Sequence, residues 1–223
     1  MLFTDIIQGK QPYCRVPQGL GRGGLGICQW PRGHVVTWTV VASLPGFDKA
    51  SLTEICKSCL DMWSNASGFL HKYTSSPKSA NMVMGVRQID GSGGVLAEHQ
   101  LPCGNITSNS QIQGWFDNTD SWTTAKNWQQ TGRMPIQQVG AHEYGHGIGI
   151  SHNEDNVTNA LMDPSISHIS SLQEWDIHQS VIRYGERAPG DDDDGITTIL
   201  APLIRCLGKL DKQDIKAIKE LFG

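Results

Sequence analysis

The stretch HEYGHGIGISH, from His142 to His152, decides the fold of this chain. It follows the pattern HExxHxxGxxH. Residues four apart share one face of a helix, so His142 and His146 can direct two imidazoles at one metal ion. Glu143 can reach a metal-bound water without completing the coordination sphere. Gly149 allows a positive φ that ends the helix, so that His152 can supply a third nitrogen, and three protein ligands with one open position are typical of catalytic zinc.

Chance is the alternative explanation for this run. With this composition, five fixed positions at such spacing arise by chance in on the order of one chain in ten thousand or fewer. A helix built only for packing would also be weakened by Gly145 and Gly147, each costing about 1 kcal/mol relative to alanine. We therefore predict one catalytic zinc held by the three histidines, with Glu143 as the general base.

A second motif, ALMDP from Ala160 to Pro164, places Met162 ten residues after His152. Together the two motifs resemble the zinc signature and methionine turn of the metzincin metallopeptidases, and ALM-x-P at this distance is closest to the matrixins, the matrix metalloproteinase family. The resemblance implies a zinc-dependent endopeptidase. It also implies that Met162 supports the metal site from below, and that Pro164 lines the pocket for the substrate side chain after the cut.

Length and composition indicate a folded globular protein. The 223 residues suit one ordinary domain with extensions, and 38% of them are hydrophobic. A net charge of −4 gives no electrostatic reason to expect nucleic acid or an anionic membrane as partner. No apolar run approaches the length needed to span a bilayer. We expect a monomer that acts on protein or peptide substrates.

The first ten residues, MLFTDIIQGK, have neither the basic region nor the long apolar region of a signal peptide. Either the chain is cytoplasmic or its targeting segment is missing from this sequence. We favour the second explanation and expect a secreted, extracellular protein.

The cysteines cannot be paired from the sequence. Six cysteines allow fifteen pairings, and they stand at Cys14, Cys28, Cys56, Cys59, Cys103 and Cys206. The CKSC segment from Cys56 to Cys59 lies in a predicted helix without a matching CxxC or histidine pair. We interpret it as two core thiols.

The hydrophobic pattern predicts an α/β (α+β) domain. Residues 34–42 are β-branched and partly alternating, which favours a central strand. Asp48 can cap a helix over 49–65. Shorter strands are predicted at 69–74, 81–87, 95–101 and 111–117.

Two further helices complete the pattern. Pro135 begins the helix that carries His142. Ser171 and Glu174 can form a capping box for a last helix that ends near Tyr184.

The matrixin resemblance covers about 30–185, which we assign as the catalytic domain. Beyond the metal motifs it rests on DGSGGVLA, WFDNTDSWT and LQEWDIHQSVIRYG. It implies a metzincin-like zincin domain with a twisted, mixed five-stranded sheet, an active-site helix and a C-terminal helix. Val95, Leu96 and Ala97 would form the antiparallel edge strand to which a peptide substrate adds. The alternative is that these three residues form a plain buried strand.

Two metal features of the matrixins need separate treatment. The family's structural zinc uses histidines where this chain has Glu98 and Trp115, and the segment between Arg87 and Asp90 contains no H-x-D. We therefore infer that the structural zinc is absent, leaving one zinc per chain. Carboxylates stand where the family places calcium ligands, so a structural calcium is a candidate, with a solvated acidic turn as the alternative; they are Asp90, Asp117 and Asp120.

The ends of the chain form separate segments. Residues 1–29 contain PYCRVPQ, which resembles the matrixin cysteine switch PRCGVPD and makes Cys14 a candidate fourth zinc ligand in a latent form. Its alternatives are a free thiol or a disulfide with Cys28. Residues 186–223 contain an acidic linker, ERAPGDDDDG, and an extra C-terminal helix.

The sequence as a whole predicts a zinc-dependent endopeptidase that hydrolyses internal peptide bonds with metal-activated water. A zinc-binding module that captures peptides on its edge strand without cutting them is one alternative. A permanently latent chain, whose N-terminal segment fills the cleft, is the other.

Overall fold

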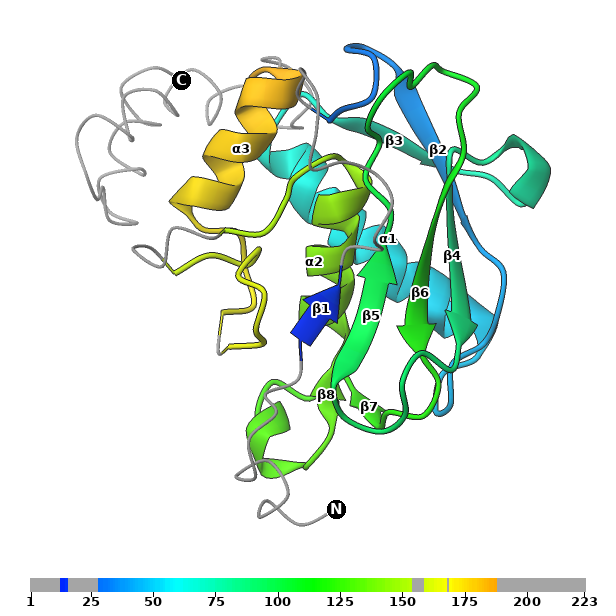
Figure 1. The fold of residues 1–223 in the computed structure, drawn as a ribbon, viewed down its shortest axis with the longest axis vertical. Coiled ribbons are helices and arrows are strands. Elements are labelled where there is room, and N and C mark those ends of the chain that lie inside the picture. The colour runs from blue at the N-terminus through cyan, green and yellow to red at the C-terminus, as the bar shows by residue number, and fades with distance from the viewer. Residues whose placement is uncertain (1–12, 16–27, 154–158, 168, 188–223) are drawn as a thin grey trace, which may run out of the picture. The chain divides into compact units, whose positions relative to one another are not determined.

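The computed structural model describes residues 13–15, 28–153, 159–167 and 169–187, and for 13–15 it gives the backbone alone (Figure 1). The chain divides into two compact units, Met1–Glu186 and Arg187–Gly223. Almost all of the second unit lies outside the described residues. The predicted acidic linker and extra C-terminal helix therefore lie there too.

The predicted mixed five-stranded sheet is confirmed. Four strands run parallel, and β5 pairs antiparallel with β6 in the spatial order β5-β6-β4-β2-β3. The strands are β2 (Val35–Val40), β3 (Leu70–Tyr73), β4 (Met82–Arg87), β5 (Val95–His99) and β6 (Ile112–Asp117).

A sixth strand, β1 (Tyr13–Arg15), adds to the outer edge of β5 and runs parallel to it. Figure 1 shows β1 in dark blue beside β5, with α2 behind the pair. We did not predict this strand, because three residues carry too little periodic signal to indicate one.

Helix α1 (Lys49–Ala66) begins where the sequence predicts. The Asp48 carboxylate accepts a hydrogen bond from the Ser51 amide at 2.7 Å and caps the helix. Its buried face includes Cys56 and Cys59, which are free thiols in the core, so the interpretation of CKSC is confirmed.

Helix α2 (Ile136–Gly147) carries the metal motif and is buried along almost its whole length. It packs against α1 and β5, and both helices cover the same face of the sheet (Figure 1). The Trp63 indole nitrogen donates to the Ala141 carbonyl at 2.9 Å, which fixes α1 against α2. The first two histidines of the metal motif therefore lie in the buried interior of the domain.

Helix α3 (Glu174–Tyr184) ends as predicted, but its cap differs. The predicted box of Ser171 and Glu174 is wrong. Gln173 is the N-cap residue, and its amide donates to the Asp176 carboxylate at 2.8 Å. Asp176 takes this capping position because its carboxylate also accepts hydrogen bonds from two backbone amides of the methionine turn. Local spacing in the sequence does not reveal these contacts.

The remaining elements are short. Two single turns of 3-10 helix, η2 (Pro77–Ser79) and η3 (Trp128–Gln130), lie in connections, and β7 (Trp122–Thr123) pairs with β8 (Met134–Pro135) just before α2. In the described part of the chain, no helix is both long and apolar enough to cross a membrane.

Candidate metal centre and active site

The three predicted metal ligands converge at the end of α2. The Nε2 atoms of His142 and His146 lie 3.1 Å apart, and those of His146 and His152 are also 3.1 Å apart. Tetrahedral zinc with Zn–N bonds of 2.0–2.1 Å would separate its nitrogen ligands by about 3.3 Å. Within the described ranges, this is the one group of three or more His, Cys, Asp or Glu side chains whose ligand atoms lie close enough together to bind one metal ion.

The protons on these rings are fixed by backbone carbonyls. His142 Nδ1 lies 2.8 Å from the Leu161 carbonyl oxygen, and His146 Nδ1 lies 2.7 Å from that of Ile150. Because a carbonyl only accepts, each Nδ1 carries the proton and each Nε2 presents a lone pair. Two lone pairs at 3.1 Å repel each other unless a cation lies between them. The donor set therefore fits zinc, with the outer partners typical of metal-binding histidines.

Burial keeps His142 and His146 neutral. It is the main cause that lowers the pKa of His142 from its ordinary 6.5 to about 3, and repulsion from His152 adds to it. The pKa of His146 is also lowered, first by burial and then by the neighbouring histidines. Neutral imidazole is the form that binds a metal, so the site is ready to bind at neutral pH.

The predicted base and the methionine lie in the same region. Glu143 follows His142 on α2 and is fully buried, as is Met162. A Cβ atom on Gly145 would overlap the Met162 sulfur, so this glycine lets the turn approach the helix closely. The absence of a side chain at Gly145, which weakens the helix, thus permits close packing of Met162 against α2.

Asp176 holds the methionine turn and was not singled out in the sequence. Its carboxylate is fully buried and accepts from the amides of Leu161 at 2.8 Å and Met162 at 3.1 Å. Burial raises its pKa. The Leu161 carbonyl in turn orients His142. The only sequence signal was an acidic residue in the first turn of the last predicted helix.

The predicted substrate edge is occupied by the chain itself. Cys14 pairs with Ala97 across the β1–β5 ladder, and Tyr13 pairs with Val95. Val95, Leu96 and Ala97 are buried. The Cys14 side chain lies outside the described residues. The backbone that carries Cys14 nevertheless follows the strand where a substrate is expected to add.

A small pocket opens beside the metal centre. Its walls come from α2 and from the methionine turn with the residues that follow it, including Pro164. The lining residues are Gln138, Val139, His142, Leu161, Asp163, Pro164, Ser165 and Ile166.

The three candidate calcium ligands lie in one loop region but are held by the backbone. The Asp117 carboxylate accepts from the Ile89 and Asp90 amides at 3.0 and 3.2 Å, and Asp120 accepts from the Gly93 amide at 2.8 Å. Burial, followed by repulsion from Asp117 and Asp90, raises the pKa of Asp120 to about 6. The loop thus brings the carboxylates near one another without gathering them as tightly as the histidines.

An ion pair forms at Glu98, one of the positions where the matrixin resemblance implies a structural-zinc histidine. The Arg87 guanidinium pairs with the buried Glu98 carboxylate and lies 4.1 Å from the centre of the Trp115 ring. A positively charged side chain of the protein thus lies next to both Glu98 and Trp115. The neighbouring His99 is buried under α2, and burial lowers its pKa to about 4.

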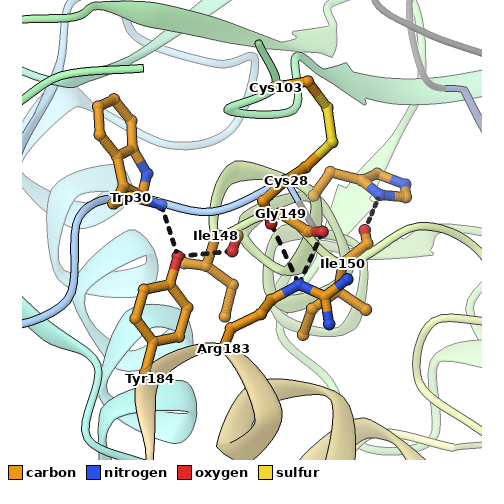
Figure 2. The surroundings of a disulfide bond; sticks show 9 residues. Cys28, Trp30, Cys103, Ile148, Gly149, Ile150, Arg183 and Tyr184 are labelled. Atoms are coloured by element: carbon orange, nitrogen blue, oxygen red, sulfur yellow. Dashed lines mark hydrogen bonds between the residues drawn. A yellow bond between two sulfur atoms is a disulfide. The ribbon is translucent and has the colours of Figure 1, made fainter. Parts of the chain in front are cut away.

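A disulfide joins Cys28 to Cys103 (Figure 2). The alternative that paired Cys14 with Cys28 is therefore wrong. Cys103 follows the end of β5, which lies far from Cys28 in the sequence, so nearness along the chain favoured the wrong partner.

A mixed sheet packed on a helix that carries HExxH, with a third histidine beyond a turn and a buried methionine packed against that helix, is typical of the metzincin class of metallopeptidases. The family profile described as Matrixin matches residues 29–184. The chain therefore belongs to the matrixin family, a family of zinc metalloendopeptidases.

Curated relatives agree with this assignment. The chain is 28% identical to interstitial collagenase of Equus caballus over 176 residues, covering 74% of this chain and 34% of that protein. It is 28% identical to the interstitial collagenase of Sus scrofa over 202 residues, covering 86% and 37%. Human matrix metalloproteinase-27 is 28% identical over 166 residues, covering 70% and 29%. The chain spans about a third of the length of the curated relatives it matches.

Proposed function

We propose that this chain is a zinc-dependent endopeptidase that hydrolyses internal bonds of proteins or peptides. The observation that carries the proposal is the convergence of imidazole lone pairs from His142, His146 and His152, two of which are fixed by hydrogen bonds from Nδ1. The three histidines would hold one zinc ion. Zinc, when bound, polarises the scissile carbonyl and lowers the pKa of a bound water.

The other steps belong to the protein. Glu143, buried beside His142, takes the proton from the attacking water and delivers it to the leaving amine. The edge of β5 binds the substrate backbone through main-chain hydrogen bonds, with Val95, Leu96 and Ala97 in contact with it. The pocket with Pro164 in its wall takes the side chain that follows the cut bond.

Replacing Glu143 with Ala tests this mechanism. We expect Glu143→Ala to retain one zinc per chain and to lose turnover by about three orders of magnitude or more, because general-base activation of water is lost. Zinc content and cleavage of a peptide library are measured on the same preparation. Glu143→Asp, which keeps a shorter carboxylate, is the matched variant and should retain part of the activity. Near-normal cleavage by Glu143→Ala would contradict the assignment.

We further propose that the chain with its N-terminal segment is latent. The support is the pairing of β1 with β5, which takes the edge that a substrate would need. Cys14 lies in that strand, and a thiolate in the same chain competes effectively with water for zinc. We propose that the residues before Cys28 act as a pro-segment, and that the catalytic domain predicted at 30–185 begins slightly earlier, with Cys28 and its disulfide. The peptide-capturing alternative predicts binding without cleavage, even after the segment is removed.

Truncation at two points tests latency. Removing residues 1–27 keeps Cys28 and its disulfide but removes β1, and should raise peptide cleavage at least tenfold. Removing residues 1–11 leaves β1 in place and serves as the control. Cys14→Ser separates the thiol from the strand, because it keeps the β1 backbone. If both truncations have the activity of the full chain, latency is excluded.

Three further assignments follow from the family. We propose a structural calcium at Asp90, Asp117 and Asp120, where the raised pKa of Asp120 supports a site that favours a cation.

We propose a secreted, extracellular location. The Cys28–Cys103 disulfide supports it, because disulfides persist in oxidising compartments. We also propose that the protein acts as a monomer.

A further inference from the structure

The end of the metal helix has four successive carbonyls that accept hydrogen bonds from side chains. Trp30 Nε1 donates to the Gly147 carbonyl at 2.9 Å, and the Tyr184 hydroxyl donates to that of Ile148 at 2.7 Å. The carbonyls of a helix's last turn have no partners further along the helix, so these donors replace the missing ones.

The next two carbonyls lead directly to the metal centre. Arg183 Nε donates to the Gly149 carbonyl at 3.0 Å. The Ile150 carbonyl accepts from His146 Nδ1 at 2.7 Å, and this contact fixes the direction of the His146 ring. His152 follows two residues later. The turn over residues 147–150 thus sets the positions of two of the three proposed zinc ligands.

The segment that contains Cys28 and Trp30 lies directly on this turn (Figure 2). The Cys28 carbonyl accepts from Arg183 Nε at 3.2 Å, and the Trp30 amide donates to the Tyr184 hydroxyl at 3.2 Å. Gly149 has a φ of 98°, and a Cβ atom there would overlap the Cys28 carbonyl. The turn and the segment therefore pack backbone against backbone, which needs a glycine at this position.

The disulfide ties this segment to the end of the edge strand. Cys103 comes just after β5, and both Leu101 and Pro102 before it are buried. Residues 28–30 are therefore held from two sides, by a covalent bond to the β5 end and by hydrogen bonds to α3. A disulfide removes alternative positions that an uncrosslinked segment would sample.

We infer that Trp30, Arg183 and Tyr184 are positioning residues for the zinc ligands, and that the Cys28–Cys103 disulfide keeps them in place, so that reducing this bond weakens zinc binding. The inference rests on the proposed zinc site. It assigns these residues an effect on the metal that is separate from any contact with substrate.

The physical reason is that hydrogen bonds to the 28–30 segment hold the turn that orients His146. When the segment detaches, the Gly147 carbonyl loses the Trp30 indole donor, and Arg183 Nε loses one of its two acceptors, the Cys28 carbonyl. The turn can then move, and with it the Ile150 carbonyl that orients His146. Loss of partners outside the metal ligands costs about 10–100-fold in metal affinity in well-studied sites.

The test compares zinc affinity and local motion in the full chain. Zinc affinity is measured by chelator competition in the wild type, in Tyr184→Phe and in Cys28→Ser/Cys103→Ser, with and without reductant. Hydrogen exchange of the 148–150 amides is measured in the metal-free protein. Ile182→Ala is the matched control, because it alters an exposed side chain on the same helix as Arg183 and Tyr184.

We expect the Cys28→Ser/Cys103→Ser variant to bind zinc about tenfold more weakly or worse, and to show no further change on reduction. Tyr184→Phe, which keeps the disulfide, should bind zinc more weakly than Ile182→Ala. In the double serine variant and in Tyr184→Phe, the 148–150 amides should exchange faster than in wild type. The amides of β4 and β6 should keep wild-type rates, which separates a local change from general destabilisation.

Zinc affinity within twofold of wild type in both variants would overturn the inference. So would faster exchange spread evenly through the core. If the wild-type chain itself binds no zinc, the proposed function fails instead, and exchange at 148–150 in the metal-free protein still tests whether the disulfide holds the turn.

Discussion

The histidine centre (His142, His146 and His152) and the acidic loop (Asp90, Asp117 and Asp120) are both groups of polar side chains. They differ in the partners that satisfy their hydrogen-bonding atoms. At the histidine centre, Nδ1 of His142 and of His146 is bound to a carbonyl and the remaining lone pairs face one another. In the acidic loop, Asp117 and Asp120 accept hydrogen bonds from backbone amides. The first group needs a cation to relieve repulsion, whereas the second is partly satisfied without one.

The Arg87–Glu98 pair is a third arrangement, in which the chain provides the cation itself. Glu98 is almost fully buried, and Arg87 pairs with it while its guanidinium lies over Trp115. The three regions show that residue type alone does not reveal a metal site. Whether a group of side chains needs a metal ion depends on the hydrogen bonds that its other polar atoms already make.

Removing the Arg87 guanidinium should have the largest effect on stability. Arg87→Ala leaves Glu98 buried without this partner and should lower the free energy of unfolding by about 1–3 kcal/mol. The double variant Arg87→Ala/Glu98→Gln removes the buried charge as well and should be more stable than Arg87→Ala alone. Chemical denaturation measures both.

An Arg87→Ala protein as stable as wild type would show that the pair contributes nothing, and that Glu98 is satisfied by other means. A zinc ion bound at this place would contradict the comparison more directly, because the region would then need a metal after all.

A smaller effect is expected in the acidic loop. The pKa of Asp120 is raised from 3.8 to about 6 in the folded state, so the folded state binds more protons than the unfolded state between these pH values. Stability from this group is therefore present below about pH 4 and is lost as pH rises to about 6. Asp120→Asn, which keeps an oxygen acceptor, should gain in stability relative to wild type over that range.

Calcium should oppose this trend, because it binds the carboxylate form in the folded state alone. The difference between wild type and Asp120→Asn is measured by thermal unfolding from pH 4 to pH 7, in chelator-stripped protein with and without millimolar calcium. A difference that does not change with pH would reject the role of Asp120. A wild-type melting temperature indifferent to calcium would reject the calcium site.

The sequence predicts those features that depend on local spacing. His142, His146 and Gly149 are set by helix geometry, and the five strands of the sheet by their hydrophobic runs. Features that depend on distant contacts escaped prediction. Strand β1 forms because β5 has a free edge, Cys28 reaches Cys103 across the fold, and Asp176 holds a turn that precedes its helix. None of these pairings has a spacing that a single sequence can reveal.

The glycines of the metal helix illustrate the same limit. Gly145 and Gly147 appear in the sequence as helix-weakening residues. The structure explains each by a close neighbour, the Met162 sulfur at Gly145 and the His99 ring at Gly147. Their cost to the helix is visible locally, whereas the packing that offsets it is not.

The central claim is that one histidine centre binds one zinc and that this zinc is required for peptide hydrolysis. The most direct test titrates zinc into metal-stripped protein lacking residues 1–27 while bound zinc and peptide cleavage are measured together. We predict that both rise in proportion and level off at one zinc per chain. Cleavage by the metal-free protein, or a need for a second tightly bound zinc, would contradict this account.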